Sequence, residues 1–166
     1  WATHGEPNDK NAHPHYSQSE NLALIHNGII ENYLSIKQLL IKEGYSFKSD
    51  TDTEVLVQLI EYIKTRYNLN LFDAVKRSLN FVIGAYAIGV IEKGNKDTIV
   101  AARKGSPLIL GVGEGEFFLG SDATAIIEYT SNVIYLNDEE VAELRLGYSP
   151  KIRNLKDQEV IHEIKK

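Results

Sequence analysis

The stretch His26-Asn27-Gly28 follows the apolar run Asn21 to Ile25, and its residue types can stabilise negative charge on an oxygen atom. The Asn27 carboxamide can donate an N–H, and Gly28 offers a backbone N–H that no side chain obstructs. Two donors aimed at one point form an oxyanion hole, which acyl-transfer reactions require. An Asn-Gly turn between strands is the structural alternative. These residues alone leave both interpretations open.

A second chemical group is the carboxylate of Asp52, which lies beside Asp50 at the expected start of a helix. A carboxylate in the first turn is stabilised by the helix dipole and needs no ligand to explain it. The functional alternative is that Asp52 binds a cationic group such as an ammonium.

Four histidines, His4, His13, His15 and His26, lie in or near a polar N-terminal stretch. Imidazole is a common zinc ligand, but their spacing matches no standard zinc pattern. Hydrogen bonds that fix a polar loop are the favoured interpretation. We therefore predict no metal and no cofactor.

Two further motifs lack chemical support. The run Gly111 to Glu116 has glutamate where a dinucleotide fingerprint needs glycine, and an apolar strand follows it, so we predict a hairpin turn. No Gly-x-Ser-x-Gly nucleophile elbow occurs, and the chain has 0 cysteines, so it supplies no thiol nucleophile.

The elements that would position these groups follow from hydrophobic periodicity. Helices are predicted over 31–43, from Thr51 onward with a Thr-x-x-Glu capping box, and over about 71–80, with residues 1–20 as a loop. A long strand covered on both faces is predicted over 81–91, and a short helix over 123–129. Other strands are expected at 21–25, 98–102, 108–112, 117–120, 133–136, 141–144 and near Ile152 and Val160. This order predicts an α+β fold with antiparallel hairpins.

Composition excludes several classes of protein. The 166 residues fit one domain, and a net charge of -5 with scattered basic residues argues against nucleic-acid binding. No apolar run approaches the roughly 18 residues of a membrane span, and the absence of cysteine and of a signal peptide favours the cytoplasm. Because the chain opens on Trp1 and has no methionine, we expect it to be an internal segment of a longer polypeptide.

Several motifs occur together in a recognisable order. They are Trp1-Ala2-Thr3-His4-Gly5-Glu6-Pro7, Asn11-Ala12-His13-Pro14-His15, His26-Asn27-Gly28-Ile29-Ile30-Glu31-Asn32, Thr51-Asp52-Thr53-Glu54, 102–108 and 120–122. In this combination the chain resembles the glutaminase domain of the glutamine:fructose-6-phosphate aminotransferase (isomerizing) family, a group of class II glutamine amidotransferases. The resemblance covers essentially the whole chain.

The resemblance implies an N-terminal-nucleophile hydrolase-like fold, a four-layer αββα sandwich of antiparallel sheets, here lacking its N-terminal portion. It implies hydrolysis of L-glutamine to glutamate and ammonia by an N-terminal cysteine. The ammonia would convert fructose 6-phosphate to glucosamine 6-phosphate in an isomerase domain of the same polypeptide, with Trp1 gating its path. A homodimer of the full-length protein is also implied.

The resemblance assigns the site residues as well. Asn27 and Gly28 would form the oxyanion hole, Asp52 would bind the α-ammonium of glutamine, and Thr3 and His4 would lie at its carboxylate. The cysteine, and an arginine expected just before the first residue, are absent from this sequence.

Residues 1–166 are thus expected to be a partial type 2 amidotransferase domain that is inactive alone, because it lacks the nucleophile. Missing strands would leave sheet edges unpaired, so dimerisation, aggregation or a companion chain is expected. The alternatives are an amidophosphoribosyltransferase-type glutaminase domain and a non-catalytic module that binds glutamine. The Trp1 to Pro7 stretch favours the sugar enzymes over the former.

Overall fold

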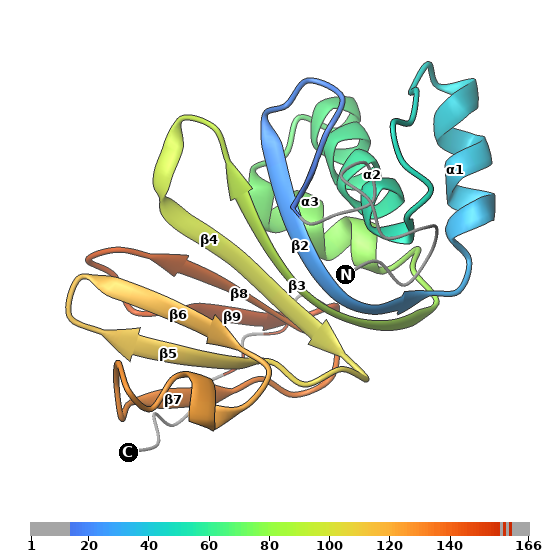
Figure 1. The fold of residues 1–166 in the computed structure, drawn as a ribbon. Helices are drawn as coiled ribbons and strands as arrows, with labels where there is room; N and C mark the ends of the chain where they lie inside the picture. The colour runs from blue at the N-terminus through green and yellow to red at the C-terminus, as the bar shows by residue number, and fades with distance from the viewer. Residues whose placement is uncertain (1–13, 157, 159, 161–166) are drawn as a thin grey trace.

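The computed structural model describes residues 14–156, 158 and 160, in which helices and strands form stacked layers (Figure 1). The helices described are α1 (Tyr33–Lys42), α2 (Asp52–Arg66), α3 (Leu71–Leu79) and the 3₁₀ helix η2 (Ala123–Ala125). The strands are β1 (His15–Tyr16), β2 (Leu22–Ile30), β3 (Gly84–Glu92), β4 (Asn95–Lys104), β5 (Ile109–Gly113), β6 (Glu116–Gly120), β7 (Val133–Tyr135), β8 (Glu140–Arg145) and β9 (Lys151–Asn154).

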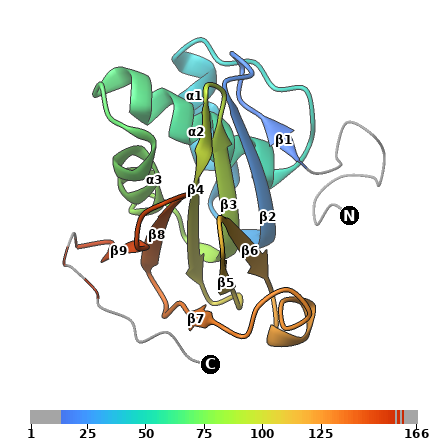
Figure 2. The ribbon, with the colours of Figure 1, turned by 90° about the vertical axis from the view of Figure 1, so that its left-hand side faces the viewer.

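The strands form two sheets. Sheet A has the order β1-β2-β3-β4-β8-β9, and sheet B has the order β6-β5-β7. Every pair of named strands is antiparallel. Helices α1, α2 and α3 cover one face of sheet A, whereas sheet B lies against the other face (Figures 1 and 2). The α+β prediction with antiparallel strands is therefore confirmed.

Side-chain alternation along the strands builds two separate cores. Tyr86, Ile88 and Val90 of β3 pack with the helices, whereas Ala87 between them packs in a second cluster with residues of sheet B. Because successive strand residues point to opposite faces, one strand serves both cores. A third, smaller cluster of Ile109, Ile126 and Val133 lies where the 123–130 segment meets sheet B.

The capping box predicted at the start of α2 has an unexpected form. The Thr51 hydroxyl accepts the N–H of Glu54 at 3.3 Å, as predicted. The Glu54 carboxylate, however, accepts the backbone N–H groups of Lys48 and Ser49 rather than that of Thr51. The helix start is therefore joined to the loop before it, which places Asp52 at a fixed point.

Strand β2 is longer than predicted. The apolar run was expected to end at Ile25, but the strand continues through Ile30 and pairs with β3 along its whole length, so Gly28 lies opposite Tyr86. An Asn-Gly turn is excluded. The two-residue strand β1 lies in a region predicted as loop, and it pairs His15 with Leu24.

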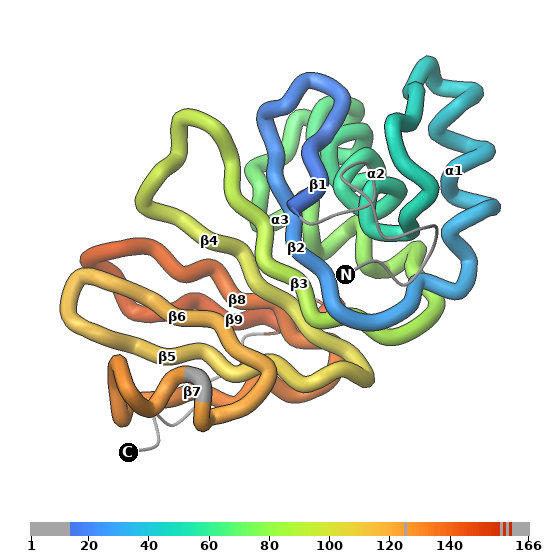
Figure 3. Tube along the Cα trace, viewed as in Figure 1, coloured from blue at the N-terminus to red at the C-terminus, as the bar shows by residue number. Residues whose placement is uncertain are grey.

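The strand predicted over 81–91 starts late. Residues 81–83 precede β3, and Phe81 and Ile83 are exposed rather than buried. The Asn32 side chain bonds the carbonyl of Phe81 and the N–H of Ile83, which fixes this segment beside the junction of β2 and α1 (Figure 3). The prediction of a strand covered on both faces was wrong here, because exposed apolar residues extended the run.

One C-terminal prediction also needs correction. The helix predicted over 123–129 is reduced to the 3₁₀ helix η2 followed by turns. The strand predicted near Val160 lies mostly outside the described residues, and the N–H of Val160 donates to the carbonyl of Ile152 in β9. The hairpin predicted over 111–116 is confirmed, since β5 and β6 pair up to Gly113 and Glu116.

Candidate functional site

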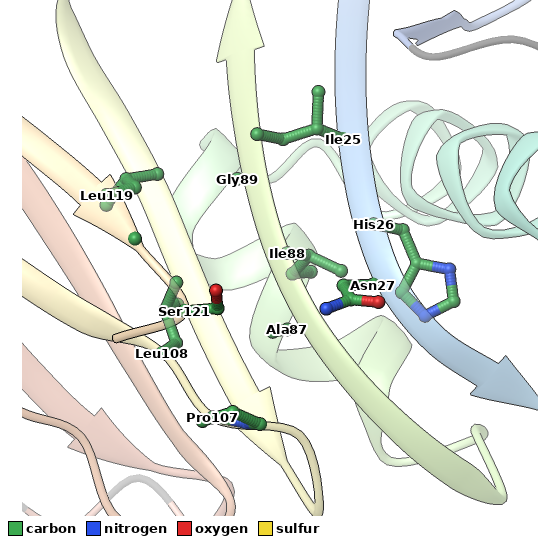
Figure 4. Close-up of a pocket in the computed structure, with 11 residues that line it drawn as sticks. Ile25, His26, Asn27, Ala87, Ile88, Gly89, Pro107, Leu108, Leu119 and Ser121 are labelled. Atoms are coloured by element: carbon green, nitrogen blue, oxygen red, sulfur yellow. The ribbon is translucent and has the colours of Figure 1, made fainter. Parts of the chain in front are cut away.

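A pocket of about 390 Å³ lies between the two sheets and contains Asn27. It is lined by β2 and β3 of sheet A, by β6 with the residues that follow it, and by Pro107 and Leu108. Figure 4 shows the Asn27 carboxamide and the His26 ring on opposite sides of β2. Asn27 is exposed, whereas His26 is buried, so the alternation of β2 delivers the carboxamide to the pocket.

The Asn27 carboxamide makes no hydrogen bond to another described residue. Its two N–H donors are therefore available to a ligand in the pocket. Ile25 lies two residues earlier on the same face of the strand and is 49% exposed. The pocket thus combines an amide donor with an apolar wall, a common composition for a small-molecule site.

Gly28 follows Asn27 and has φ +125°, a backbone conformation that residues with a side chain rarely adopt. A β-carbon placed on it would lie 2.4 Å from the carbonyl oxygen of Ala85, which is backbone of the neighbouring strand. Only glycine fits this position. This geometry is compatible with the prediction that no side chain of residue 28 obstructs its backbone N–H.

Asp52 lies at the first position of α2 and is completely buried. Its Oδ2 accepts the backbone N–H of Ile30 at 2.8 Å, so the carboxylate joins α2 to the end of β2. Gly28 and Ile30 are two residues apart, a distance of about 7 Å along a strand. The structure therefore joins Asp52 of α2 to strand β2 at a point two residues after Gly28.

Two histidines connect the same elements. Nδ1 of His26 lies 3.1 Å from the hydroxyl of Thr53, and Nε2 of His15 lies 3.0 Å from the hydroxyl of Thr51. Both rings are buried. In the described part of the chain no group of histidines and carboxylates is arranged to hold a metal ion.

The other predicted site residues, Trp1, Thr3 and His4, lie outside the described residues, as does His13. Sequence reasoning considered His26 only as a possible metal ligand or loop donor, and it missed its contact with Thr53. It also missed Ser106, whose hydroxyl lies beside Gly28. Neither contact has a local sequence signal, because the partners are far apart in the chain.

Burial strongly raises the pKa of Tyr86, which lies opposite Gly28 on β3, and the nearby carboxylates of Glu139 and Asp138 raise it further. This tyrosine is completely buried, so it stays neutral over the physiological range. It supports the strand behind the site and contributes no charge to the pocket.

Comparison with known proteins identifies the class as an amidotransferase domain. Residues 5–128 match the family model described as "Glutamine amidotransferase domain", so the chain belongs to this family. None of the helices in the described ranges is long and apolar enough to cross a bilayer.

Similar curated proteins carry a more specific name. The chain is 58% identical over 166 residues to a glutamine--fructose-6-phosphate aminotransferase [isomerizing] of Bacteroides thetaiotaomicron, covering 100% of this chain and 27% of the relative. The protein of the same name from Chlorobaculum tepidum is 53% identical over 167 residues, covering 99% of this chain and 27% of the relative. The chain thus spans about a quarter of the length of these relatives.

Solved structures support the fold. The glutamine phosphoribosylpyrophosphate amidotransferase of B. subtilis, complexed with ADP and GMP, matches with a TM-score of 0.74 and 26% identity over 93% of this chain and 34% of that chain. A structure described as the allosteric regulatory enzyme of purine biosynthesis matches with a TM-score of 0.72 and 28% identity, covering 91% and 32%. The predicted N-terminal-nucleophile hydrolase-like fold is therefore confirmed, in a chain that spans part of these proteins.

Proposed function

We propose that this chain is the greater part of the glutaminase domain of an enzyme that makes glucosamine 6-phosphate from fructose 6-phosphate. The domain hydrolyses L-glutamine to glutamate and ammonia, and an isomerase domain of the same polypeptide uses the ammonia. The similarity to the two named aminotransferases across nearly the whole chain supports this proposal. The alternative, an amidophosphoribosyltransferase, has less support, because the solved phosphoribosylpyrophosphate amidotransferase matches at only 26% identity.

The observation that carries the mechanism is the Asn27 carboxamide in the pocket, directly followed by Gly28 on the same strand. A cysteine thiolate adds to the amide carbon of glutamine, and the carbonyl oxygen becomes an oxyanion. The Asn27 side-chain N–H and the Gly28 backbone N–H donate to it. Collapse of this intermediate forms a thioester and releases ammonia, and water then hydrolyses the thioester to glutamate.

Asp52 binds the other end of the substrate in this proposal. A carboxylate has about four lone-pair sites, so the bond from Ile30 does not exhaust it. The strand spacing of about 7 Å between Gly28 and Ile30 is comparable to an extended glutamine from its α-ammonium to its side-chain amide. Thr3 and His4 lie near the substrate carboxylate, and Trp1 gates the ammonia path.

The chain by itself is inactive in this proposal, because its sequence has 0 cysteines and the reaction needs a thiolate. No metal or cofactor is required. Residues 1–166 form a partial type 2 amidotransferase domain of a cytoplasmic protein that is a homodimer at full length. Glutamate release by the purified chain would contradict the first statement.

The decisive experiment measures glutamate release from glutamine by the complete natural protein, with and without fructose 6-phosphate. Release that increases with the sugar phosphate and decreases at least about 100-fold in Asn27→Ala supports the proposal, since one oxyanion donor is worth that much. A full-length protein that binds glutamine but releases no glutamate would instead be a glutamine-binding module.

A further inference from the structure

The loop between β4 and β5 brings a hydroxyl group to the proposed oxyanion glycine. A β-carbon placed on Gly28 would lie 2.9 Å from Oγ of Ser106, as well as 2.4 Å from the Ala85 carbonyl oxygen. The space that a side chain would occupy is therefore filled by the neighbouring strand and by Ser106. In the described part of the chain the Ser106 hydroxyl makes no hydrogen bond of its own.

This loop is anchored by an arginine. Arg103 donates from Nε to the carbonyl oxygen of Ser106 at 2.8 Å and from Nη1 to the carbonyl of Leu136 at 2.9 Å. Its Nη2 lies 2.9 Å from Oδ1 of Asp138, which also accepts the backbone N–H of Gly105. One guanidinium thus holds three oxygens, so the backbone that carries Ser106 has little freedom.

A glycine amide needs such external support. Gly28 has no side chain to restrict its peptide planes, and its φ of +125° is accessible to glycine without strain. An oxyanion donor is effective only if it is oriented before charge develops. Pairing with β3 restrains Gly28 along the strand, and the Ser106 hydroxyl adds a contact at the place where a side chain would stand.

We propose that Ser106 is a positioning residue of the glutaminase reaction, which Arg103 and Asp138 hold against Gly28 so that the Gly28 amide stays oriented. This inference rests on the proposed function. It assigns Arg103, Ser106 and Asp138 a role in the speed of the chemical step and none in glutamine affinity. Lys104 lies between Arg103 and Ser106 in sequence, but its ammonium group pairs at 3.0 Å with Glu139 and makes none of these contacts.

The test compares Ser106→Ala and Arg103→Lys with the matched control Lys104→Ala in the full-length protein. The readouts are kcat and KM for glutamine hydrolysis, at a temperature at which thermal unfolding shows each variant folded. We expect kcat to decrease about tenfold in Ser106→Ala with KM within about twofold of wild type. Arg103→Lys should lose at least as much, because lysine cannot bridge three oxygens, and Lys104→Ala should match wild type.

The outcomes separate this inference from the proposed function. An active wild-type protein with unchanged kcat in Ser106→Ala overturns the positioning role alone. A raised KM with unchanged kcat also overturns it and makes Ser106 a substrate-binding residue. A wild-type protein without glutaminase activity overturns the proposed function and this inference together. If Arg103→Lys does not fold, the kcat and KM of Ser106→Ala alone decide whether Ser106 is a positioning residue.

Discussion

The two faces of sheet A are built from side chains of different size. Toward the helices, β3 presents Tyr86, Ile88 and Val90, all of which are almost completely buried. Toward sheet B the same strand presents Ala87 and Gly89, and both line the pocket. Large residues fill the space on the first face, whereas small ones leave a pocket on the second. A close-packed core and a pocket therefore lie on opposite faces of one strand.

We therefore expect that adding an atom lowers the free energy of unfolding more than removing one does. At Gly28 and Gly89 the neighbouring atoms are close, so an added methyl group meets either backbone or the tip of a side chain. On the helix face the side chains are already close-packed, and removing a polar atom without a partner costs little. Four substitutions test this contrast.

Gly28→Ala should have the largest effect. Its β-carbon would lie 2.4 Å from a backbone oxygen that cannot move alone, and the φ of +125° adds strain. We expect a loss of at least about 3 kcal/mol in the free energy of unfolding. Urea denaturation measures this.

Gly94→Ala is the matched control, because its φ is +84° but its β-carbon would meet nothing within 4 Å. It isolates the conformational cost, which is about 1 kcal/mol. Equal losses in the two variants would show that the contact with β3 is unimportant.

Asp52→Asn should come next. It weakens the bond from Ile30 by removing the charge of the acceptor, at a cost of about 1–2 kcal/mol in stability. On the proposed function it also raises the KM for glutamine about 10- to 100-fold, because the ammonium loses its counter-charge. Steady-state kinetics of the full-length protein measure KM. Asp97→Asn, at an exposed carboxylate, should leave KM at the wild-type value.

Gly89→Ala should have a smaller effect. Its β-carbon would lie 2.8 Å from Cδ1 of Leu119, which is the end of a flexible side chain that can move. We expect a loss of about 1 kcal/mol. In a Leu119→Ala background the same substitution should cost less, and a double-mutant cycle by urea denaturation measures that coupling. Strict additivity would mean that the two residues do not share the pocket wall.

Tyr86→Phe should have the smallest effect, because the buried hydroxyl has no hydrogen-bond partner among the described residues. Stability near neutral pH should change by less than about 1 kcal/mol.

Alkaline pH should reveal a difference in stability between Tyr86→Phe and the wild-type protein. Burial raises the pKa of Tyr86 above its ordinary value of 10.0, so folding favours the protonated form. This contribution is complete below pH 10.0 and is lost as the pH rises toward the folded pKa. Stability should therefore decrease less steeply above pH 10.0 in Tyr86→Phe than in wild type, as urea unfolding at several pH values would show. Parallel profiles would assign the loss to other groups.

Local signals predicted α1, α2 and α3 well but not the 123–129 segment, and the end of β2 and the surroundings of the site depend on distant residues. The Thr51 cap and the apolar spacing placed α2 within a residue of its observed start. By contrast, His26 interrupts an apolar pattern, and it is buried within the strand beside Thr53, which is distant in sequence. No pattern near Ser106 indicates that it meets Gly28, because β2 and the 105–107 loop approach only in the folded chain.

The alternation along β2 also limits how this segment can change over evolutionary time. His26 faces inward to Thr53, while Asn27 faces the pocket, so one strand carries a core residue and a pocket residue in turn. Inserting or deleting a single residue upstream would exchange the two faces. It would bury the carboxamide and expose the imidazole together. Length changes that keep this domain intact must therefore occur in multiples of two residues within the strand, or be absorbed by the loops beyond its ends.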